Sequence, residues 1–149
     1  MNSLLLAFLL SLAPISELRG GLPVALASGN PFIISLLICI LANILVFPVV
    51  IFFLEFIHHR LLFFKTYRNV AEKFIERTRK KAHKKVEKYG YFGLFLLVAI
   101  PLPFTGAYTG TIASWFFGMN KLKSFITITA GIITASILVS IIYYGVLFL

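Results

Sequence analysis

The positive charge of this chain is confined to two short segments that separate long apolar tracts. Thirteen of the fourteen Lys and Arg residues lie between Arg60 and Lys88 or at Lys121 and Lys123, and the apolar tracts contain one basic residue, Arg19. Lys and Arg that flank apolar segments and collect on one side are typical of a multi-pass membrane protein. The charge pattern therefore predicts both the class of fold and its topology.

The composition requires a lipid environment. The 149 residues are 60% hydrophobic and 13% charged, with a mean hydropathy of +0.98, so a soluble domain would expose a large apolar surface to water. The net charge of +9 would suit nucleic acid, but the cations flank membrane segments and no recognition module is present. We therefore expect membrane lipids with anionic headgroups, and no nucleic acid, as partners. The single Cys39 excludes an internal disulfide and suits helix packing.

The first half of the chain contains one full membrane span after a broken apolar region. Residues 2–13 form an apolar run that is too short for a hydrocarbon core of about 30 Å. The tract Pro14 to Pro23 contains two prolines and two glycines and predicts a break in helical structure. A second short stretch ends at Gly29. Residues 31–57 are long enough for one crossing, with Pro48 as the expected kink.

Residues 58–89 differ completely from the tracts around them. Eleven Lys or Arg and three Glu give this segment a charge of +8 up to Lys88, and aromatic or aliphatic residues recur at helical spacing. The pattern predicts a basic amphipathic helix on the cytoplasmic membrane surface, a linker that anchors the topology. The residues expected at that surface are Arg77, Arg79, Lys80, Lys81, Lys84 and Lys85. The three histidines lack the spacing of a metal site, and we expect no metal and no cofactor.

The second half repeats the organisation of the first half. A shift of 89 positions places Pro14 on Pro103, Gly21 on Gly110, Gly29 on Gly118 and Ser35 on Ser124. Residues 1–57 therefore form repeat 1, with a hairpin over 1–29 and a span over 31–57. Residues 90–149 form repeat 2, with a hairpin over 90–118 and a span over 121–149. The residues expected to break or pack the two hairpins are Pro14, Pro23, Pro101, Pro103, Gly106 and Gly110.

The charge distribution decides how the hairpins cross. If residues 91–118 crossed the bilayer once, Lys121 and Lys123 would lie opposite the basic linker, against the positive-inside rule. Two re-entrant hairpins, entering from opposite sides, keep these cations cytoplasmic and both termini external. The sequence thus predicts an all-α polytopic protein of the plasma membrane, an inverted repeat whose hairpin tips meet near the midplane. A cavity between only two spans and four hairpin arms would be poorly sealed from the surrounding lipid. We therefore expect a homodimer.

The N-terminal run has a competing interpretation as a signal peptide. LLLAFLLSLA resembles an apolar signal region, and Ala25-Leu26-Ala27 resembles a cleavage site. No basic region precedes the run, and Glu17 and Arg19 interrupt it. We therefore favour a retained hairpin.

Glu17 and Arg19 are the prime functional candidates. An ionised side chain near the bilayer centre costs about 2.5 to 3.5 kcal/mol, so two such groups need pairing, a wet cavity or a ligand. Their spacing favours a non-helical tip, where backbone amides beside Gly20 and Gly21 would help Arg19 to hold an anion such as phosphate. Glu17 is a candidate proton carrier unless Arg19 keeps it ionised. The alternative role is a structural network that pins the two hairpins together.

The second tip offers hydroxyl groups without charge. Thr105, Tyr108 and Thr109 would either solvate Glu17 and Arg19 or line a substrate path. Gly106 and Gly110 form a GxxxG pattern, which more often packs helices than binds ligands.

The two tips resemble the signatures of a known family. PISELRGGLPVALASG is similar to the first signature of the small multidrug export family, and PLPFTGAYTGTIA is similar to the second, in which Phe104 replaces a usual glycine. That family is related in organisation to the DedA and VTT-domain membrane proteins. The resemblance implies that this chain combines re-entrant hairpins with spans, as those proteins do. Several of those proteins are implicated in moving lipids between leaflets, including polyprenyl-phosphate carriers. By motif, Glu17 and Arg19 match the acidic and basic hairpin positions of those relatives. DedA proteins usually add an arginine to the second hairpin, and this chain has none there.

These observations lead us to expect a transporter of an amphipathic anion, such as a lipid or polyprenyl phosphate, with Arg19 as headgroup ligand. One alternative is a proton-coupled exporter of small cationic compounds, which depends on Glu17. Another is a non-transporting scaffold that acts through the basic linker. We do not expect an enzyme, because the spans contain no nucleophile and base pair, metal cluster or paired carboxylates.

Overall fold

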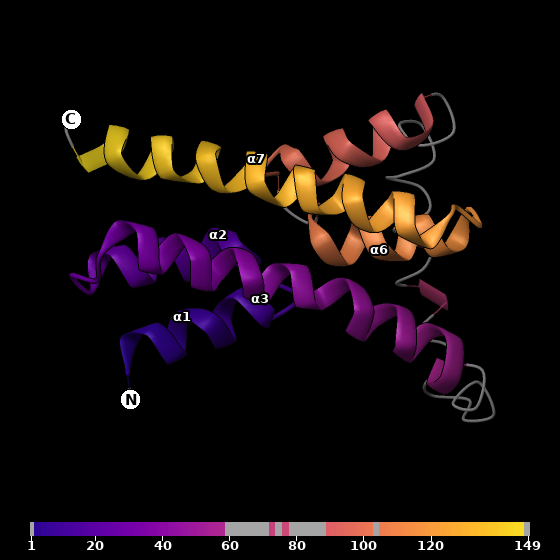
Figure 1. The fold of residues 1–149 in the computed structure, drawn as a ribbon, viewed down its shortest axis with the longest axis horizontal. Helices are drawn as coiled ribbons and strands as arrows, with labels where there is room; N and C mark the ends of the chain where they lie inside the picture. Colours follow the sequence, from indigo (N-terminus) through magenta and orange to yellow (C-terminus); the bar gives the residue numbers. More distant parts are fainter. Residues whose placement is uncertain (1, 59–71, 74–75, 78–88, 103–104, 148–149) are drawn as a thin grey trace.

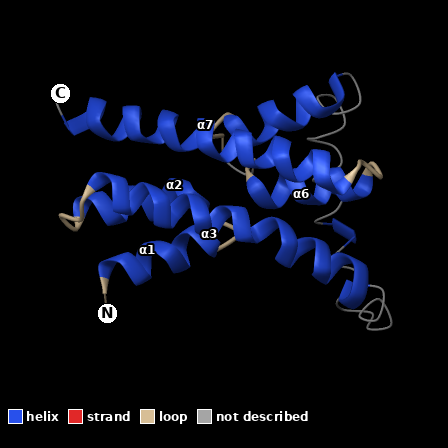
Figure 2. Ribbon diagram, in the orientation of Figure 1, coloured by secondary structure: helices blue, strands red, loops and turns tan. Residues whose placement is uncertain are grey.

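The computed structural model describes residues 2–58, 72–73, 76–77, 89–102 and 105–147, and every regular element in these ranges is a helix (Figure 2). The elements are α1 (Ser3–Leu12), α2 (Glu17–Ala27), α3 (Phe32–Phe52), η1 (Phe53–His58), the helix Tyr89–Ala99, α6 (Ala107–Phe116) and α7 (Lys121–Leu147). The sequence-based expectation of an all-helical protein is confirmed. Most of the expected linker helix over 58–89 lies outside the described residues, as do Arg79, Lys80, Lys81, Lys84, Lys85 and Pro103.

Two helices are long and apolar enough to cross a membrane. The first comprises α3 and most of η1, Phe32–Phe56, and the second is α7, Lys121–Val146. Their 25 and 26 residues give roughly 37 to 39 Å at about 1.5 Å per residue, more than a hydrocarbon core of about 30 Å. Pro48 lies inside α3 without ending it. The two spans predicted over 31–57 and 121–149 are therefore present as helices.

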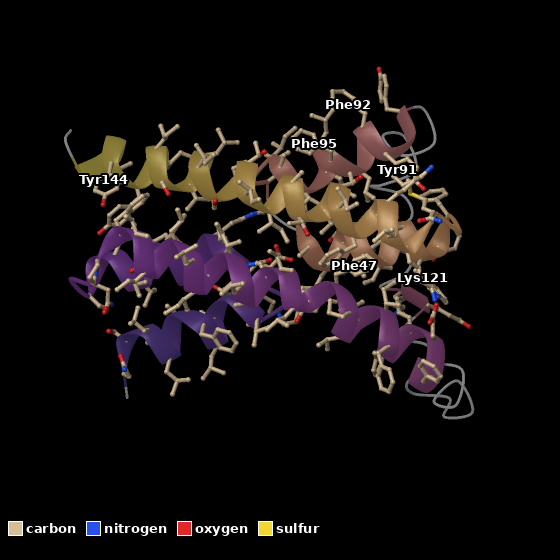
Figure 3. All side chains as sticks on the ribbon, in the orientation of Figure 1. Phe47, Tyr91, Phe92, Phe95, Lys121 and Tyr144 are labelled. Atoms are coloured by element: carbon tan, nitrogen blue, oxygen red, sulfur yellow. The ribbon has the colours of Figure 1, made fainter. Side chains whose placement is uncertain are left out.

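The two spans are antiparallel and lie side by side (Figures 1 and 3). Three side-chain pairs at successive levels join them: Phe32 with Tyr144 at 5.8 Å between ring centroids, Phe47 with Phe125 at 5.4 Å, and Glu55 with Lys121 in an ion pair of 2.5 Å. One end of the molecule consequently holds both chain termini, whereas η1 and the start of α7 lie at the other end.

Two shorter helical hairpins enter this frame from opposite ends (Figure 1). In the first, α1 runs inward and α2 returns, and Ser3 Oγ and Asn30 Nδ2, near the open end, are 3.0 Å apart. In the second, the helix Tyr89–Ala99 runs inward and α6 returns, so that the Tyr91 hydroxyl accepts a hydrogen bond from the Asn120 N–H at 3.1 Å. Both tips lie in the middle of the molecule.

The breaks at the hairpin tips are shorter than the sequence suggested. The tracts 14–23 and 101–110 were both expected to interrupt helical structure, but α2 begins at Glu17 and α6 begins at Ala107. The expectation of a non-helical setting is therefore wrong for Arg19, which lies in the first turn of α2, whereas Glu17 is the first residue of that helix and has a left-handed φ of +47°. Pro23 lies inside this helix, which tolerates the one backbone hydrogen bond that proline removes.

The ends of α2 and α6 are closed by the same backbone arrangement. Gly29 and Gly118, 89 positions apart, have φ of +77° and +61°, and a glycine in this left-handed region commonly closes a helix. The N–H groups of Gly29, Asn30, Gly118 and Met119 donate to the carbonyls of Leu26, Ala25, Trp115 and Ser114, respectively. The sequence correspondence between the two halves extends to these hydrogen bonds.

Close helix contacts in the core depend on small residues. A Cβ added to Gly110 would lie 2.6 Å from Val98 Cγ2, and one added to Gly131 would lie 2.8 Å from Val98 Cβ. Val98 therefore packs tightly between α6 and α7. Large apolar side chains cover the outer faces instead, for example Leu37, Leu41, Leu45 and Val49 along α3. This distribution of buried small and exposed large residues suits a helical protein surrounded by lipid.

Candidate functional site

Glu17 begins α2 in a backbone conformation that is rare for a residue with a side chain. Its φ is +47°, and only 7% of the residue is exposed. Such a conformation costs on the order of 1 to 3 kcal/mol and persists where surrounding contacts enforce it. One such contact is a hydrogen bond of 3.3 Å that the Tyr108 N–H donates to Glu17 Oε1. The position of the carboxylate thus depends on the second hairpin.

The carboxylate of Glu17 lies at the N-terminus of α6. The residue preceding this helix, Gly106, has no side chain to accept hydrogen bonds from the first turn, and Glu17 supplies an acceptor from the other hairpin. A carboxylate is favourable there because the first N–H groups of a helix lack internal partners. A Cβ on Gly106 would overlap Glu17, with the carboxyl carbon only 2.7 Å away. Gly106 therefore makes room for the charged group.

Arg19 binds the loop between the helix Tyr89–Ala99 and α6. Its Nη2 donates to the carbonyl oxygen of Thr105 at 2.7 Å and to Thr105 Oγ1 at 2.9 Å, and its Nη1 donates to the Leu102 carbonyl. These bonds use three of the five N–H donors of a guanidinium. Within the described residues the remaining donors have no acceptor. Arg19 thus retains hydrogen-bonding capacity for a ligand.

Glu17 and Arg19 do not neutralise each other by direct contact. In the described part of the chain no ion pair joins them, and each reaches a different part of the second hairpin. Both therefore link the hairpins, as in the structural role considered above. Glu17 is buried and Arg19 is partly buried, and charges without a directly paired partner are costly in lipid unless a wet cavity or a ligand solvates them.

Asn43 joins this cluster from α3 and was missed by the sequence analysis. It is 1% exposed, and its Nδ2 donates to the Ser11 carbonyl at 3.2 Å. The Tyr108 hydroxyl donates to the neighbouring Leu12 carbonyl. Both acceptors belong to the end of α1, where carbonyls lack helical partners. A lone asparagine inside an apolar span is the signal that would have identified Asn43.

Two pockets meet at Arg19. The first has a volume of about 280 Å³ and is lined by Pro14, Ile15, Ser16, Glu17, Arg19, Pro101, Thr105 and Thr109. The second has a volume of about 440 Å³ and is lined by Arg19, Pro23, Pro101, Val139, Ile142, Tyr143 and Val146. The first contains charges and hydroxyls, whereas the second is apolar apart from Arg19 and the Tyr143 hydroxyl. The guanidinium therefore stands at the boundary between a polar and an apolar space.

The predicted site residues separate into two groups. Thr105 and Thr109 line the polar pocket with Glu17 and Arg19, and Tyr108 contacts Glu17 through its backbone. Backbone amides beside Gly20 and Gly21 were expected to help bind an anion, but the Gly20 N–H donates to the Ser16 carbonyl at 3.0 Å. A Cβ on Gly20 would meet Ser16, and one on Gly21 would meet Ser11 and Ala7. Arg77 is exposed in one of the short described pieces of the linker.

Comparison with known proteins identifies a family to which most of the chain belongs. Residues 17–138 match the family described as putative small multi-drug export protein, a range that begins at Glu17 and includes Arg19 and the second tip. No curated protein and no solved structure matches the chain. The family and the two long apolar helices indicate a membrane protein with a transport function. Because the match covers more than half of the sequence, the chain belongs to the putative small multi-drug export protein family.

Proposed function

We propose that this transporter moves an amphipathic anion, such as a lipid or polyprenyl phosphate, between the leaflets of the plasma membrane. The observation that supports this substrate is the position of Arg19, which lines both the polar and the apolar pocket. A guanidinium suits a phosphate through paired hydrogen bonds. A ligand with a charged head and a hydrocarbon chain matches the two pockets on either side of it.

The membrane arrangement that we propose is an inverted repeat of two re-entrant hairpins, each followed by a span. Three observations support this arrangement. The two hairpins enter from opposite ends of the molecule, their tips lie together in its middle, and Gly29 and Gly118 make equivalent hydrogen bonds. Irregular backbone at membrane depth is tolerated where it is buried in protein or lines a wet cavity. The basic linker is cytoplasmic and both termini are external in this arrangement.

A relationship to the DedA and VTT-domain proteins is part of the proposal. The acidic and basic residues of the first tip, Glu17 and Arg19, correspond to that pattern. This chain lacks an arginine in the second tip, and there Thr105 instead receives hydrogen bonds from Arg19. A single basic residue consequently serves both tips. The headgroup is therefore bound with less positive charge than in those relatives.

Glu17 is the candidate proton carrier of the transport cycle. It is nearly buried, lines the polar pocket with Arg19, and has no ion-pair partner among the described residues. A carboxyl group in that setting can alternate between charged and neutral forms as the occupancy of the pocket changes. Glu17 would then carry a proton in the same cycle that moves the anion.

The second candidate function is proton-coupled export of small cationic compounds. The family description and the Glu17 carboxylate in the polar pocket favour it. Arg19 opposes it, because this guanidinium lines the same pocket and repels a cation. Anion transport requires Arg19, whereas cation export requires Glu17 and tolerates the loss of Arg19. Substitutions at these two positions therefore distinguish the two functions.

The test is leaflet exchange in proteoliposomes that contain a fluorescent polyprenyl phosphate or an ordinary phospholipid. The parent protein is compared with Arg19→Ala, Glu17→Gln and, as a control for loss of an exposed charge, Arg77→Ala. We expect exchange of the phosphate to collapse in the first two variants and to persist in the third. Exchange no faster than in empty liposomes would refute the lipid function. Efflux of a cationic dye that needs Glu17 but tolerates Arg19→Ala would establish the second candidate.

A further inference from the structure

The apolar pocket beside α7 is lined by residues that binding of a headgroup alone does not explain. Four of its residues, Val139, Ile142, Tyr143 and Val146, recur at helical spacing and form one face of α7. Pro23 from α2 and Pro101 from the second tip line the pocket as well. The pocket therefore lies between the C-terminal half of α7, α2 and the second tip.

The residues that line the pocket from α7 are buried at one end and exposed at the other. Val139 is 7% exposed, whereas Ile142 is 57% exposed and Val146 is 69% exposed. Exposure thus increases along α7 toward its C-terminal end, which is the end of the molecule where both termini lie (Figure 1). A ligand can enter sideways from the surrounding lipid at that end.

The charged group that lines this pocket is the guanidinium of Arg19. Among the described residues, Arg19 is the one charged residue that lines it, and Arg19 also lines the polar pocket with Glu17 and Thr105. A hydrocarbon chain in the apolar pocket would therefore end at a guanidinium whose remaining N–H donors have no acceptor among the described residues. This order of an apolar wall followed by a cation complements a chain that ends in a phosphate.

We propose that the apolar pocket binds the hydrocarbon chain of a single-chain lipid phosphate, which enters from the leaflet at the end of the molecule that holds the termini. The proposal rests on the proposed function of Arg19 as headgroup ligand. The volume of about 440 Å³ is near the lower end of the range of about 300 to 1,000 Å³ for ligand pockets. It accommodates a segment of one chain, so a single-chain phosphate is preferred to a two-chain phospholipid.

Neighbouring isoleucines on α7 provide a matched pair of variants. Ile142 lines the pocket, whereas Ile141 does not, although Ile141 is similarly exposed at 63%. Ile142→Trp places a bulky ring at the pocket, and Ile141→Trp places the same ring on the lipid-facing side. Val139→Phe adds bulk at the more buried end of the pocket lining, with Leu138→Phe as its control. Size-exclusion profiles and helical circular dichroism establish that each variant is folded.

The first measurement is exchange of a fluorescent polyprenyl phosphate and of fluorescent phosphatidic acid in proteoliposomes. Since small changes in an apolar pocket alter selectivity by about 10- to 200-fold, we expect Ile142→Trp to slow exchange of the single-chain phosphate at least about tenfold. Ile141→Trp should remain within about twofold of the parent. Equal rates in these two variants, with Arg19→Ala inactive, would overturn the chain-binding pocket while the proposed function stands. Equal exchange of both lipids by the parent would overturn the single-chain preference.

The second measurement separates binding from transport. A polyprenyl phosphate with a benzophenone at the far end of its chain is photo-crosslinked to the parent protein in lipid nanodiscs. Labelling concentrated in residues 139–146, and reduced by Ile142→Trp, supports the pocket even if the parent shows no exchange, in which case the proposed transport function alone fails. Labelling spread evenly over α3 and α7 would overturn the chain-binding pocket.

Discussion

The carboxylate of Glu17 accepts a hydrogen bond from the backbone N–H of Tyr108, 91 positions later in the chain. This contact places an acid of the first hairpin at the start of a helix of the second hairpin. Arg19, two residues after Glu17, binds Thr105 two residues before the same helix begins. The two charged residues therefore both help to hold the tips together and define the polar pocket between them.

The structural and functional roles of Glu17 can be separated by two substitutions. Glu17→Gln keeps an oxygen that accepts from Tyr108, so we expect its free energy of unfolding to stay within about 1 kcal/mol of the parent. Glu17→Ala leaves that partly buried N–H without its acceptor and should cost about 1 to 3 kcal/mol. Thermal unfolding in detergent measures both. Equal destabilisation by the two variants would show that the hydrogen bond is not what Glu17 contributes to the fold.

Gly106→Ala is expected to disrupt the meeting of the tips. The residue has φ of +135°, and its added Cβ would overlap the Glu17 carboxylate. Strain of this kind costs on the order of 1 to 3 kcal/mol, and displacement of Glu17 should also slow transport. Gly145→Ala is the control, since a Cβ there has open space and lies within α7. If both alanine variants unfold at the same temperature as the parent, a Cβ at Gly106 is tolerated beside the Glu17 carboxylate.

The membrane arrangement predicts which ends of the hairpins are accessible from each side. On a Cys39→Ala background, a cysteine at Ser28 should react with an impermeant reagent only from outside, and one at Lys123 only from the cytoplasm. Both positions are exposed and close to the open end of a hairpin. Labelling from opposite sides is required because Ser28 follows the end of α2, which lies at the end of the molecule with both termini, whereas Lys123 belongs to the start of α7 at the opposite end (Figure 1). Labelling of both from one side would exclude the inverted arrangement.

The ion pair between Glu55 and Lys121 is expected to add little stability. Its side chains are 30% and 63% exposed, and exposed pairs contribute about 0 to 1 kcal/mol. Lys121→Ala should therefore lower the free energy of unfolding by less than about 1 kcal/mol, and the exchanged pair Glu55→Lys with Lys121→Glu should recover most of that loss. A larger loss in Lys121→Ala would mean that the pair is shielded from water at the membrane surface.

Several features of the fold could be predicted from local sequence patterns. The spans follow from uninterrupted apolar residues, and the breaks follow from proline and glycine at the tips. Their bounds were too wide, because a proline at the seventh position of α2 removes one hydrogen bond without ending the helix. The equivalence of Gly29 and Gly118 was also visible in the sequence, and the structure adds their shared left-handed conformation.

The partners of the charged residues could not be predicted in the same way. The sequence identified Glu17 and Arg19 as the charges that need explanation, because their cost in lipid depends on residue type and position alone. Only the tertiary structure shows that Arg19 binds the loop at Leu102 and Thr105, that Asn43 joins from α3, and that α7 forms an apolar pocket ending at Arg19. Hydropathy and helix propensity are local properties, whereas these contacts arise from the packing of segments far apart in the chain.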